Sequence, residues 1–501
     1  MKPALDSARW TVPGVMGAGL GAMVLALSTK ALGIVIAAIA FAAMTASSVV
    51  TYYVLVATIP VQVELLGGIT ITKLITPLAI GMVTLNAVAR RGPWPTVFQW
   101  PAGHLAWMFF GTSIVSLSLA DGVNHFPGEA AKVPVYASLY FLTLTFVRTP
   151  EDFRRLLWVI TLTGAAEAII TAAQVHFGFV MPGDWRHNIG LPSEGGMDGS
   201  FMSMSEGKIR AEGTTAHPIL LASFFLMAIP CAAFLFFQET RFRTKIILSG
   251  ILALMLYAWF YTFARSSLIG FAILTMVTLW FRSRVVRKLS LVSVLFIIAG
   301  FLSYQVISEW LQSGIQSLEG QSPFGKADLN EGSASFEFRR ESIAGGWNLF
   351  LAYPLFGVGF GQAINHYMPY LPSWASHPFH PAVIHNTFLE VASELGVFAL
   401  FAFLGIWGWA FMSVKRGLRF SASRPYSILM LGILLGQMGF LMITPMVREL
   451  WLTLPMAIAI GQMQGLREQM TDCVPNDRRS MVNGRANRLF RAQQIRTDPS
   501  P

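Results

Sequence analysis

The sequence predicts an all-α polytopic integral membrane protein, and two observations predict this class. Of its 501 residues, 54% are hydrophobic and only 12% are charged, whereas a soluble protein carries about 25% charged residues. Many apolar runs reach the ~17–25 residues that cross the hydrocarbon core of a bilayer. Cys231 and Cys473 lie far apart in unlike surroundings, so they predict neither a disulfide framework nor a metal site.

The apolar runs set the expected number of membrane spans. Residues 12–64 are compatible with three short helices or with fewer long ones, so we expect about 12 (12 to 14) transmembrane helices. The first run lacks a cleavage site and is predicted to remain as an anchor. The runs are 12–28, 31–46, 48–64, 70–88, 104–120, 133–148, 156–179, 217–237, 246–262, 266–281, 289–307, 384–412, 426–446 and 450–464.

The distribution of basic residues predicts the orientation. Basic connections alternate with the acidic or mixed connections 121–132, 180–216 and 308–383. Lys and Arg favour cytoplasmic connections, so both termini are expected in the cytoplasm and the two long loops in the periplasm of a bacterial inner membrane. The basic clusters are Arg148, Arg154 and Arg155; Arg241, Arg243 and Lys245; Arg282, Arg284, Arg287 and Lys288; and Lys415, Arg416, Arg419 and Arg424.

Two regions follow from this pattern. Residues 1–466 are expected to form the transmembrane domain, including the periplasmic loops 180–216 and 308–383, and the second loop is expected to contain short helices. Residues 467–501 form a basic tail that is predicted to be cytoplasmic and disordered. This tail accounts for much of the net charge of +10. Attraction to anionic membrane lipids explains that charge without a nucleic-acid partner.

The first long loop ends in a candidate anion site. Arg210 lies a few residues before an apolar run, and Gly213 and Thr214 are suited to bending the backbone and exposing N–H groups at a helix start. The structural alternative is a turn in which Thr214 or Thr215 caps the helix beside an exposed arginine.

The second long loop contains an amphipathic pattern and a glycine-rich turn. Phe336, Arg340, Ile343, Trp347 and Phe350 follow helical spacing, and Arg340 falls inside the apolar stripe, where it is costly unless it meets an anion. The helix is expected to stop at Pro354. The Gly-x-Gly-x-Gly segment over 357–361 lacks the strand–helix context of a dinucleotide fingerprint and predicts a tight turn.

His385 lies where the second loop meets an apolar run, so it is expected at the membrane surface. An imidazole with a pKa near 6.5 accepts a proton at neutral pH. The structural alternative is a polar residue that snorkels at a helix end. Arg265 lies between two apolar runs on the same side, where positive charge is disfavoured. Arg210, Arg265 and Arg339 or Arg340 on one side of the membrane favour a lipid-linked diphosphate as the ligand.

These motifs together resemble the O-antigen ligase and O-antigen polymerase superfamily over about residues 50–465. The His-Asn-x9-Gly element is the most specific of them. Members often have Gly, Thr or Tyr three positions after that glycine, where this chain has Ala399. The motifs are Arg210 with Gly213-Thr214; Ala264-Arg265-Ser266; Arg339 and Arg340 leading to Pro354-Leu355-Phe356-Gly357-Val358-Gly359; and His385-Asn386 followed after nine residues by Gly396.

The resemblance implies an inverting glycosyltransferase with a GT-C-like helical fold. Such a ligase transfers O-antigen en bloc from undecaprenyl diphosphate to lipid A-core on the periplasmic face. His385 is then the expected base, with Arg210 and Arg265 as catalytic cations. The diphosphate leaves without protonation, so neither a metal nor a cofactor is expected. The expected substrate-binding residues are Arg339, Arg340, Asn386, Gly213 and Thr214.

Three alternative functions remain open at this point. An O-antigen or exopolysaccharide polymerase performs the same chemistry on a glycan acceptor. A protein O-oligosaccharyltransferase of the same superfamily uses a protein acceptor. A transporter of lipid-linked oligosaccharides would carry ionisable groups or broken helices near the bilayer midplane. The apolar runs are poor in such groups, which favours an enzyme.

Overall fold

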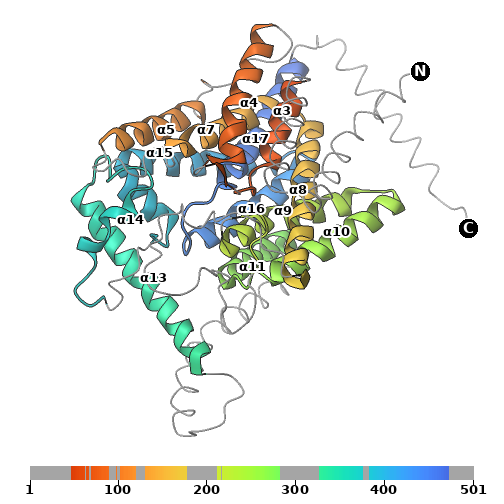
Figure 1. Ribbon diagram of the computed structural model, residues 1–501. Helices are drawn as coiled ribbons and strands as arrows, with labels where there is room; N and C mark the ends of the chain where they lie inside the picture. Colours follow the sequence, from red (N-terminus) through yellow and green to blue (C-terminus); the bar gives the residue numbers. More distant parts are fainter. Residues whose placement is uncertain are drawn as a thin grey trace, which may run out of the picture.

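The computed structural model describes residues 47–62, 64–66, 69–89, 98, 102–119, 130–177, 211–215, 217–281, 326–375 and 383–472, and most of these residues are helical (Figure 1). For residues 64–66, 69, 265, 326–338 and 464–472 it describes the backbone alone. The secondary-structure elements in chain order are α3 (Ser48–Ala57), β1 (Glu64–Leu66), β2 (Ile69–Thr70), α4 (Ile71–Val88), α5 (Ala102–Leu119), α7 (Lys132–Phe146), α8 (Pro150–Phe177), α9 (Pro218–Gln238), α10 (Phe242–Phe260), α11 (Arg265–Trp280), α13 (Lys326–Ala352), α14 (Ala363–His366), the short 3-10 helix η2 (Met368–Tyr370), α15 (Thr387–Gly417), α16 (Arg424–Leu441) and α17 (Leu450–Asp472).

Seven of the described helices, α4, α5, α8, α9, α10, α15 and α16, are long and apolar enough to cross a membrane. Shorter apolar helices lie at Ser48–Ala57, Ser266–Trp280 and Leu450–Met463. The chain is therefore a helical multi-pass membrane protein, with one small antiparallel hairpin, β1–β2, in the described part. The predicted runs 12–28, 31–46 and 289–307 lie outside the described residues, so the total of about 12 spans stays a prediction.

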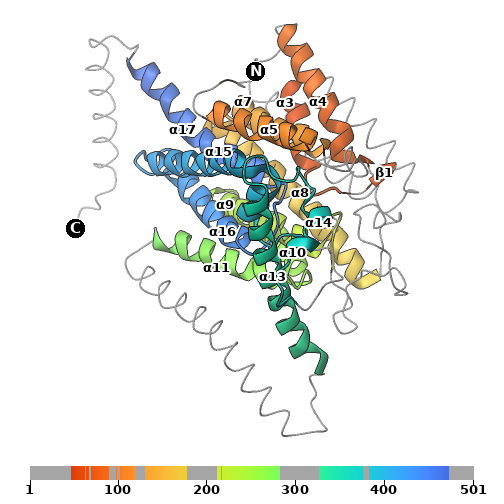
Figure 2. The ribbon, with the colours of Figure 1, turned by 90° about the vertical axis from the view of Figure 1, so that its left-hand side faces the viewer.

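The helices pack around one aromatic core. Helix α15 packs against both α5 and α17, and Figures 1 and 2 show it lying beside α5. Trp451 of α17 is completely buried, and its ring centroid lies 4.7 Å from that of Phe109 and 5.0 Å from that of Phe110. Close packing and ring contacts of this kind hold helices together where lipid offers no hydrophobic driving force.

Helices α11 and α16 pack with their backbones unusually close. A Cβ atom on Gly270 would lie 2.9 Å from the carbonyl oxygen of Gly436, and one on Gly436 would lie 2.7 Å from that of Gly270. Paired small residues permit this approach in membrane helices. The contact fixes the start of α11, and therefore Arg265, relative to the end of α16.

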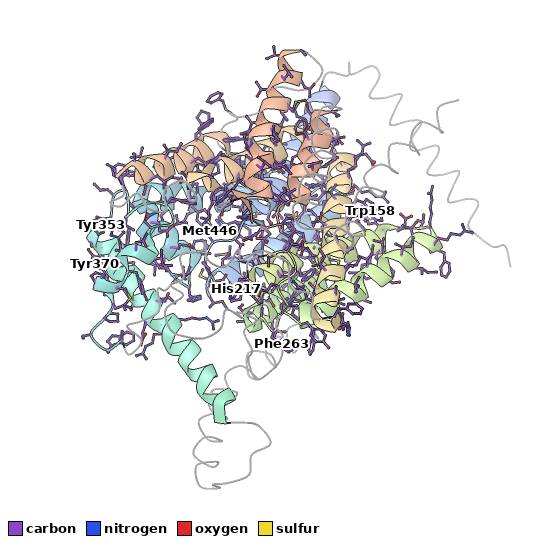
Figure 3. The ribbon with its side chains drawn as sticks, in the orientation of Figure 1. Trp158, His217, Phe263, Tyr353, Tyr370 and Met446 are labelled. Atoms are coloured by element: carbon purple, nitrogen blue, oxygen red, sulfur yellow. The ribbon has the colours of Figure 1, made fainter. Side chains whose placement is uncertain are left out.

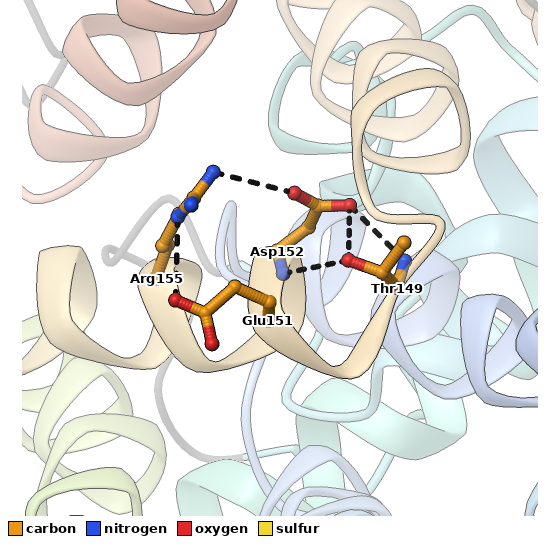
Figure 4. Close-up of polar contacts among 4 residues, drawn as sticks. All are labelled: Thr149, Glu151, Asp152 and Arg155. Atoms are coloured by element: carbon orange, nitrogen blue, oxygen red, sulfur yellow. Dashed lines mark hydrogen bonds and ion pairs between the residues drawn. The ribbon is translucent and has the colours of Figure 1, made fainter. Parts of the chain in front are cut away.

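The predicted cytoplasmic connection before α8 contains a capping box (Figure 4). The Asp152 N–H donates to the Thr149 hydroxyl at 3.1 Å, and the Thr149 N–H donates back to the Asp152 carboxylate at 3.1 Å. Arg155 lies 3.6 Å from Glu151 and 3.7 Å from Asp152. Reciprocal capping satisfies N–H groups that a helix start leaves unpaired, which explains why α8 begins here.

The amphipathic helix expected in the second loop is present as α13, and its apolar stripe is exposed rather than packed against other helices. Ile343 is 38% exposed, Trp347 is 53% exposed, and Arg340 is also exposed. The buried face instead carries Gly345 and Gly346. Cβ atoms on these glycines would press against Tyr367 and Ile384, so α13 packs through its smallest residues. Apolar spacing identified the helix, whereas close backbone packing selected its buried face.

The glycine-rich turn at residues 357–361 packs against a kink in α15. Gly396 has φ +78° inside that helix, and a Cβ atom there would overlap the Leu355 carbonyl. The N–H of Val358 donates to Ser393 O at 3.1 Å, and the N–H of Gly359 donates to Glu394 O at 3.0 Å. Gly357, Gly359 and Gly361 all have positive φ, which confirms the predicted tight turn.

Candidate active site

His385 lies in the last turn of chain before α15 and is fixed there by α13. Its backbone N–H donates to the Ser342 hydroxyl at 2.9 Å, and that hydroxyl donates to the Val383 carbonyl at 3.0 Å. Ser342 is completely buried. The Tyr367 hydroxyl also hydrogen-bonds Ser342, so the serine is held from two elements. The imidazole therefore has a defined place between α13 and α15.

The surroundings of His385 keep its side chain neutral. Burial lowers its pKa from the usual 6.5 to about 4, and the positive charge of Arg339, followed by the nearby His217, acts in the same direction. A buried imidazole loses hydration of its charged form, and like charges add to that loss. His385 is thus unprotonated across the neutral pH range, which a general base requires.

Arg339, rather than Arg340, is the arginine of α13 that acts on His385. Arg339 and Ser342 are three residues apart and share one helix face, which is the face toward the His385 segment. Arg340 points away from that face, with its guanidinium 4.3 Å from the centre of the Trp374 ring. A cation–π contact stabilises an exposed arginine without any anion.

His217 is a residue of this cluster that the sequence did not single out. It caps α9, because the Ile219 N–H donates to its Nδ1 at 3.1 Å. The helix cap expected at Thr214 or Thr215 is therefore at His217 instead. Accepting this bond requires an unprotonated Nδ1, so the neutral ring carries its proton on Nε2. Figure 3 draws His217 near the middle of the molecule.

Gly213 and Thr214 are bound to α8. The Gly213 N–H donates to the Gln174 side chain at 2.8 Å, and the Thr214 N–H donates to the Glu167 carboxylate at 2.8 Å. The Thr214 hydroxyl also donates to Glu167. Gly213 has φ +62°, and a Cβ atom there would collide with the same carboxylate. Both N–H groups are thus used inside the protein, where they fix the segment that follows Arg210.

The structure describes little of the two remaining predicted cations, Arg210 and Arg265. Arg210 lies outside the described residues, and only the backbone of Arg265 is described, as the first residue of α11. The N–H of Ala211 donates to the Tyr261 carbonyl at 3.0 Å. This bond joins the chain next to Arg210 to the connection that leads into Arg265. Phe263, labelled in Figure 3, turns that connection with φ +48°.

Part of the chain matches a known protein family. Residues 250–404 match the family model described as O-antigen ligase, a stretch that runs from α10 into α15 and includes Arg265, Arg339 and His385. This match supports a relationship of that stretch to the O-antigen ligase and polymerase superfamily. No curated protein matches it.

Asn386 is the N-cap of α15. Its side-chain oxygen accepts the Leu389 N–H at 3.0 Å, and its side-chain nitrogen donates to the Met442 carbonyl at 3.1 Å. Both ends of the amide are therefore engaged within the protein. The first contact begins the helix directly after His385, and the second ties that start to the end of α16.

The carboxylates of Glu390 and Glu394 accept hydrogen bonds from backbone N–H groups. Glu390 accepts the Met446 N–H at 2.6 Å. Glu394 accepts the N–H groups of Gly361 at 2.8 Å and Ala363 at 3.3 Å. Together with the Gly396 kink, these bonds give a physical reason for the His-Asn-x9-Gly spacing. The histidine opens the helix, and the glycine lets the turn at 357–361 pack two to three turns below it.

Proposed function

We propose that this protein is an O-antigen ligase. In this proposal it transfers O-antigen polysaccharide en bloc from undecaprenyl diphosphate to lipid A-core, on the periplasmic face of the inner membrane and on a GT-C-like fold. The observation that carries the proposal is the neutral imidazole of His385 beside the positive charge of Arg339. A base next to a cation suits a reaction in which one substrate loses a proton and the other releases an anion.

The reaction needs one proton acceptor and one stabilised leaving group. The acceptor hydroxyl of lipid A-core gives its proton to His385 while its oxygen bonds to the anomeric carbon of the donor sugar. The bond from that carbon to the diphosphate oxygen breaks with inversion, and the electron pair leaves with undecaprenyl diphosphate. Arg339, Arg265 and Arg210 are proposed to stabilise the charge on this group.

Donor binding is proposed to prepare His385 for its role. In the free protein Arg339 and His217 disfavour protonation of the imidazole, which makes it a weak base. A diphosphate beside Arg339 offsets that positive field and raises the pKa of His385 toward neutrality. The base is then strongest when the donor is in place, which favours binding of donor before acceptor.

Positive side chains are proposed to take the place of a metal ion. Among the residues that the structure describes, no three His, Cys, Asp or Glu side chains are grouped in a way that could hold one. We therefore expect transfer to continue after divalent cations are chelated. Gly213 and Thr214 are proposed to position Arg210, because their N–H groups are bound to Gln174 and Glu167.

Deletion of the gene tests the activity, and a matched pair of histidine variants tests the base. Loss of the lipopolysaccharide ladder with accumulation of lipid-linked polymer indicates a ligase, whereas collapse to single repeats indicates a polymerase. In vitro, His385→Ala should lower turnover about 10²–10⁴-fold and leave donor binding nearly unchanged. His104→Ala is the control, because that exposed histidine lies at the opposite end of α5 from the residues near Glu394. Normal turnover of a folded His385→Ala protein would refute the assignment.

A further inference from the structure

The connection between α16 and α17, residues 442–449, is attached to the first turn of α15. Its contacts are the bond from Asn386 to Met442 and that from Met446 to Glu390, together with a bond of 3.0 Å from the Thr387 hydroxyl to the Thr444 carbonyl. These three hydrogen bonds, all to residues 386–390 at the start of α15, keep the connection close to the His385 segment. Met446 is drawn near His217 in Figure 3.

Arg448 is the cation of this connection. Its side chain is half-buried, and its Nη1 atom is fully buried with no hydrogen-bond acceptor among the described residues. A buried N–H of a charged group is costly unless it meets an acceptor, so this position calls for one.

The neighbouring Glu449 compensates Arg448 only in part. Glu449 is 2% exposed, and one of its carboxylate oxygens has no hydrogen-bond donor within the described portion of the chain. Burial raises the pKa of its carboxyl from 4.5 to about 7, although the charge of Arg448 opposes that rise. A carboxyl that is partly protonated at neutral pH leaves net positive charge on the pair.

The sequence position of Arg448 supports the same reading. The preceding residues, Met442–Val447, carry no charge, and the connection lies at the end of the bundle expected in the periplasm. Positive residues are disfavoured in short connections on that side, so an arginine there needs a functional reason. The hydrogen bond from Met446 to Glu390 places this connection at the start of α15, close to the segment that carries the proposed base.

We propose that Arg448 is a further substrate-binding residue, which binds a phosphate group of a lipid-linked substrate beside His385. The proposal rests on the transferase function proposed above. A guanidinium donates to two phosphate oxygens at once and so is suited to this ligand. The phosphate belongs either to the donor diphosphate or to the acceptor, and these two sources are separable by experiment.

The test compares two neutral substitutions of similar shape in the full-length protein. Binding of undecaprenyl diphosphate to purified Arg448→Gln and Glu449→Gln is measured in nanodiscs, followed by the KM for lipid A-core with saturating donor. Arg448→Gln should raise either the dissociation constant for undecaprenyl diphosphate or the KM for lipid A-core by about 10- to 100-fold, as loss of a charged hydrogen bond does. A rise in the dissociation constant assigns the contact to the donor, and a rise in KM alone assigns it to the acceptor.

Glu449→Gln separates a binding role from a structural ion pair. If Arg448 binds phosphate, removing the neighbouring carboxylate should leave binding equal or tighter. If the two residues only stabilise each other, both variants should lose binding or abundance to the same extent, which overturns the proposal. Unchanged binding and KM in a folded Arg448→Gln protein also overturns it. If Arg448→Gln does not fold, Arg448→Lys serves instead, because it keeps the charge and should weaken binding by losing the two-point contact.

A cytoplasmic arginine provides the control, and the wild type provides the reference for the underlying function. Arg419→Ala removes an exposed arginine between α15 and α16 at the other end of the bundle and should change neither measurement. Wild-type protein that neither binds undecaprenyl diphosphate nor transfers glycan would contradict the transferase function itself. If the wild type is active and Arg448→Gln changes neither donor binding nor the KM, only the proposed role of Arg448 is contradicted.

Discussion

The pH profile of transfer should report the unusual environment of His385. Burial, the charge of Arg339 and the nearby His217 lower its pKa to about 4 in the free protein. Activity falls as pH drops through that pKa, because the protonated imidazole cannot accept a proton. At pH 5.5 about 97% of a group with pKa 4 is neutral, against about 9% for an unperturbed histidine with pKa 6.5. We therefore expect kcat/KM, measured from pH 4 to 9, to remain near its plateau at pH 5.5.

Two further measurements make this expectation specific. In kcat, where the donor is bound, the acid midpoint should lie above that in kcat/KM, since the diphosphate offsets the positive field. Arg339→Gln should raise the kcat/KM midpoint by up to about one pH unit, because burial, the larger cause, persists. Arg340→Gln is the matched control and should leave the midpoint in place, because Arg340 contacts Trp374 instead. An acid midpoint near 6.5 that does not move in Arg339→Gln would refute the reasoning.

Three further predictions test the support of the site and its side of the membrane. Gly396→Ala should sharply lower protein abundance and thermal stability, measured by fluorescence-detected chromatography, because φ +78° and the Leu355 carbonyl both exclude a Cβ atom. Gly408→Ala is the control: a Cβ atom there meets no atom within 4 Å, so this variant should be as stable as the wild type or slightly more stable. Ser342→Ala should lower kcat about 10-fold by releasing the His385 segment while undecaprenyl diphosphate still binds; equal kcat would contradict the positioning role. In an otherwise cysteine-free protein, Ser373→Cys should react with an impermeant thiol reagent in spheroplasts and Ser421→Cys should not, and the reverse pattern would invert the proposed orientation.

Local sequence patterns were sufficient for the parts of the site that depend on neighbours along the chain. The junction between a polar loop and an apolar run located His385, and the following helix begins at the next residue but one, Thr387. The glycine-rich segment predicted a tight turn, and the positive φ values confirm it. Each inference used only the conformational limits of a few adjacent residues, which the sequence states directly.

The same patterns did not determine which arginine of α13 acts on His385. Adjacent residues on a helix point about 100° apart, so Arg339 and Arg340 cannot face the same partner. Apolar spacing favoured a face containing Arg340, Ile343 and Trp347. The helix instead buries its glycines against Tyr367 and Ile384, and this rotation carries Arg339 toward the histidine. The contacts that determine which face of α13 is buried come from residues distant in sequence.

By itself, the sequence determined that this protein is a helical membrane protein, that its polar chemistry gathers at the ends of helices, and that His385 stands at one such end. Composition and periodicity decide these properties, because each depends on transfer into lipid and on local helical geometry. Only the tertiary structure brought Ser342, His217 and the connection that contains Arg448 toward that histidine. Their roles arise from hydrogen bonds and charges between separate helices, and no local pattern in the chain encodes which helices become neighbours.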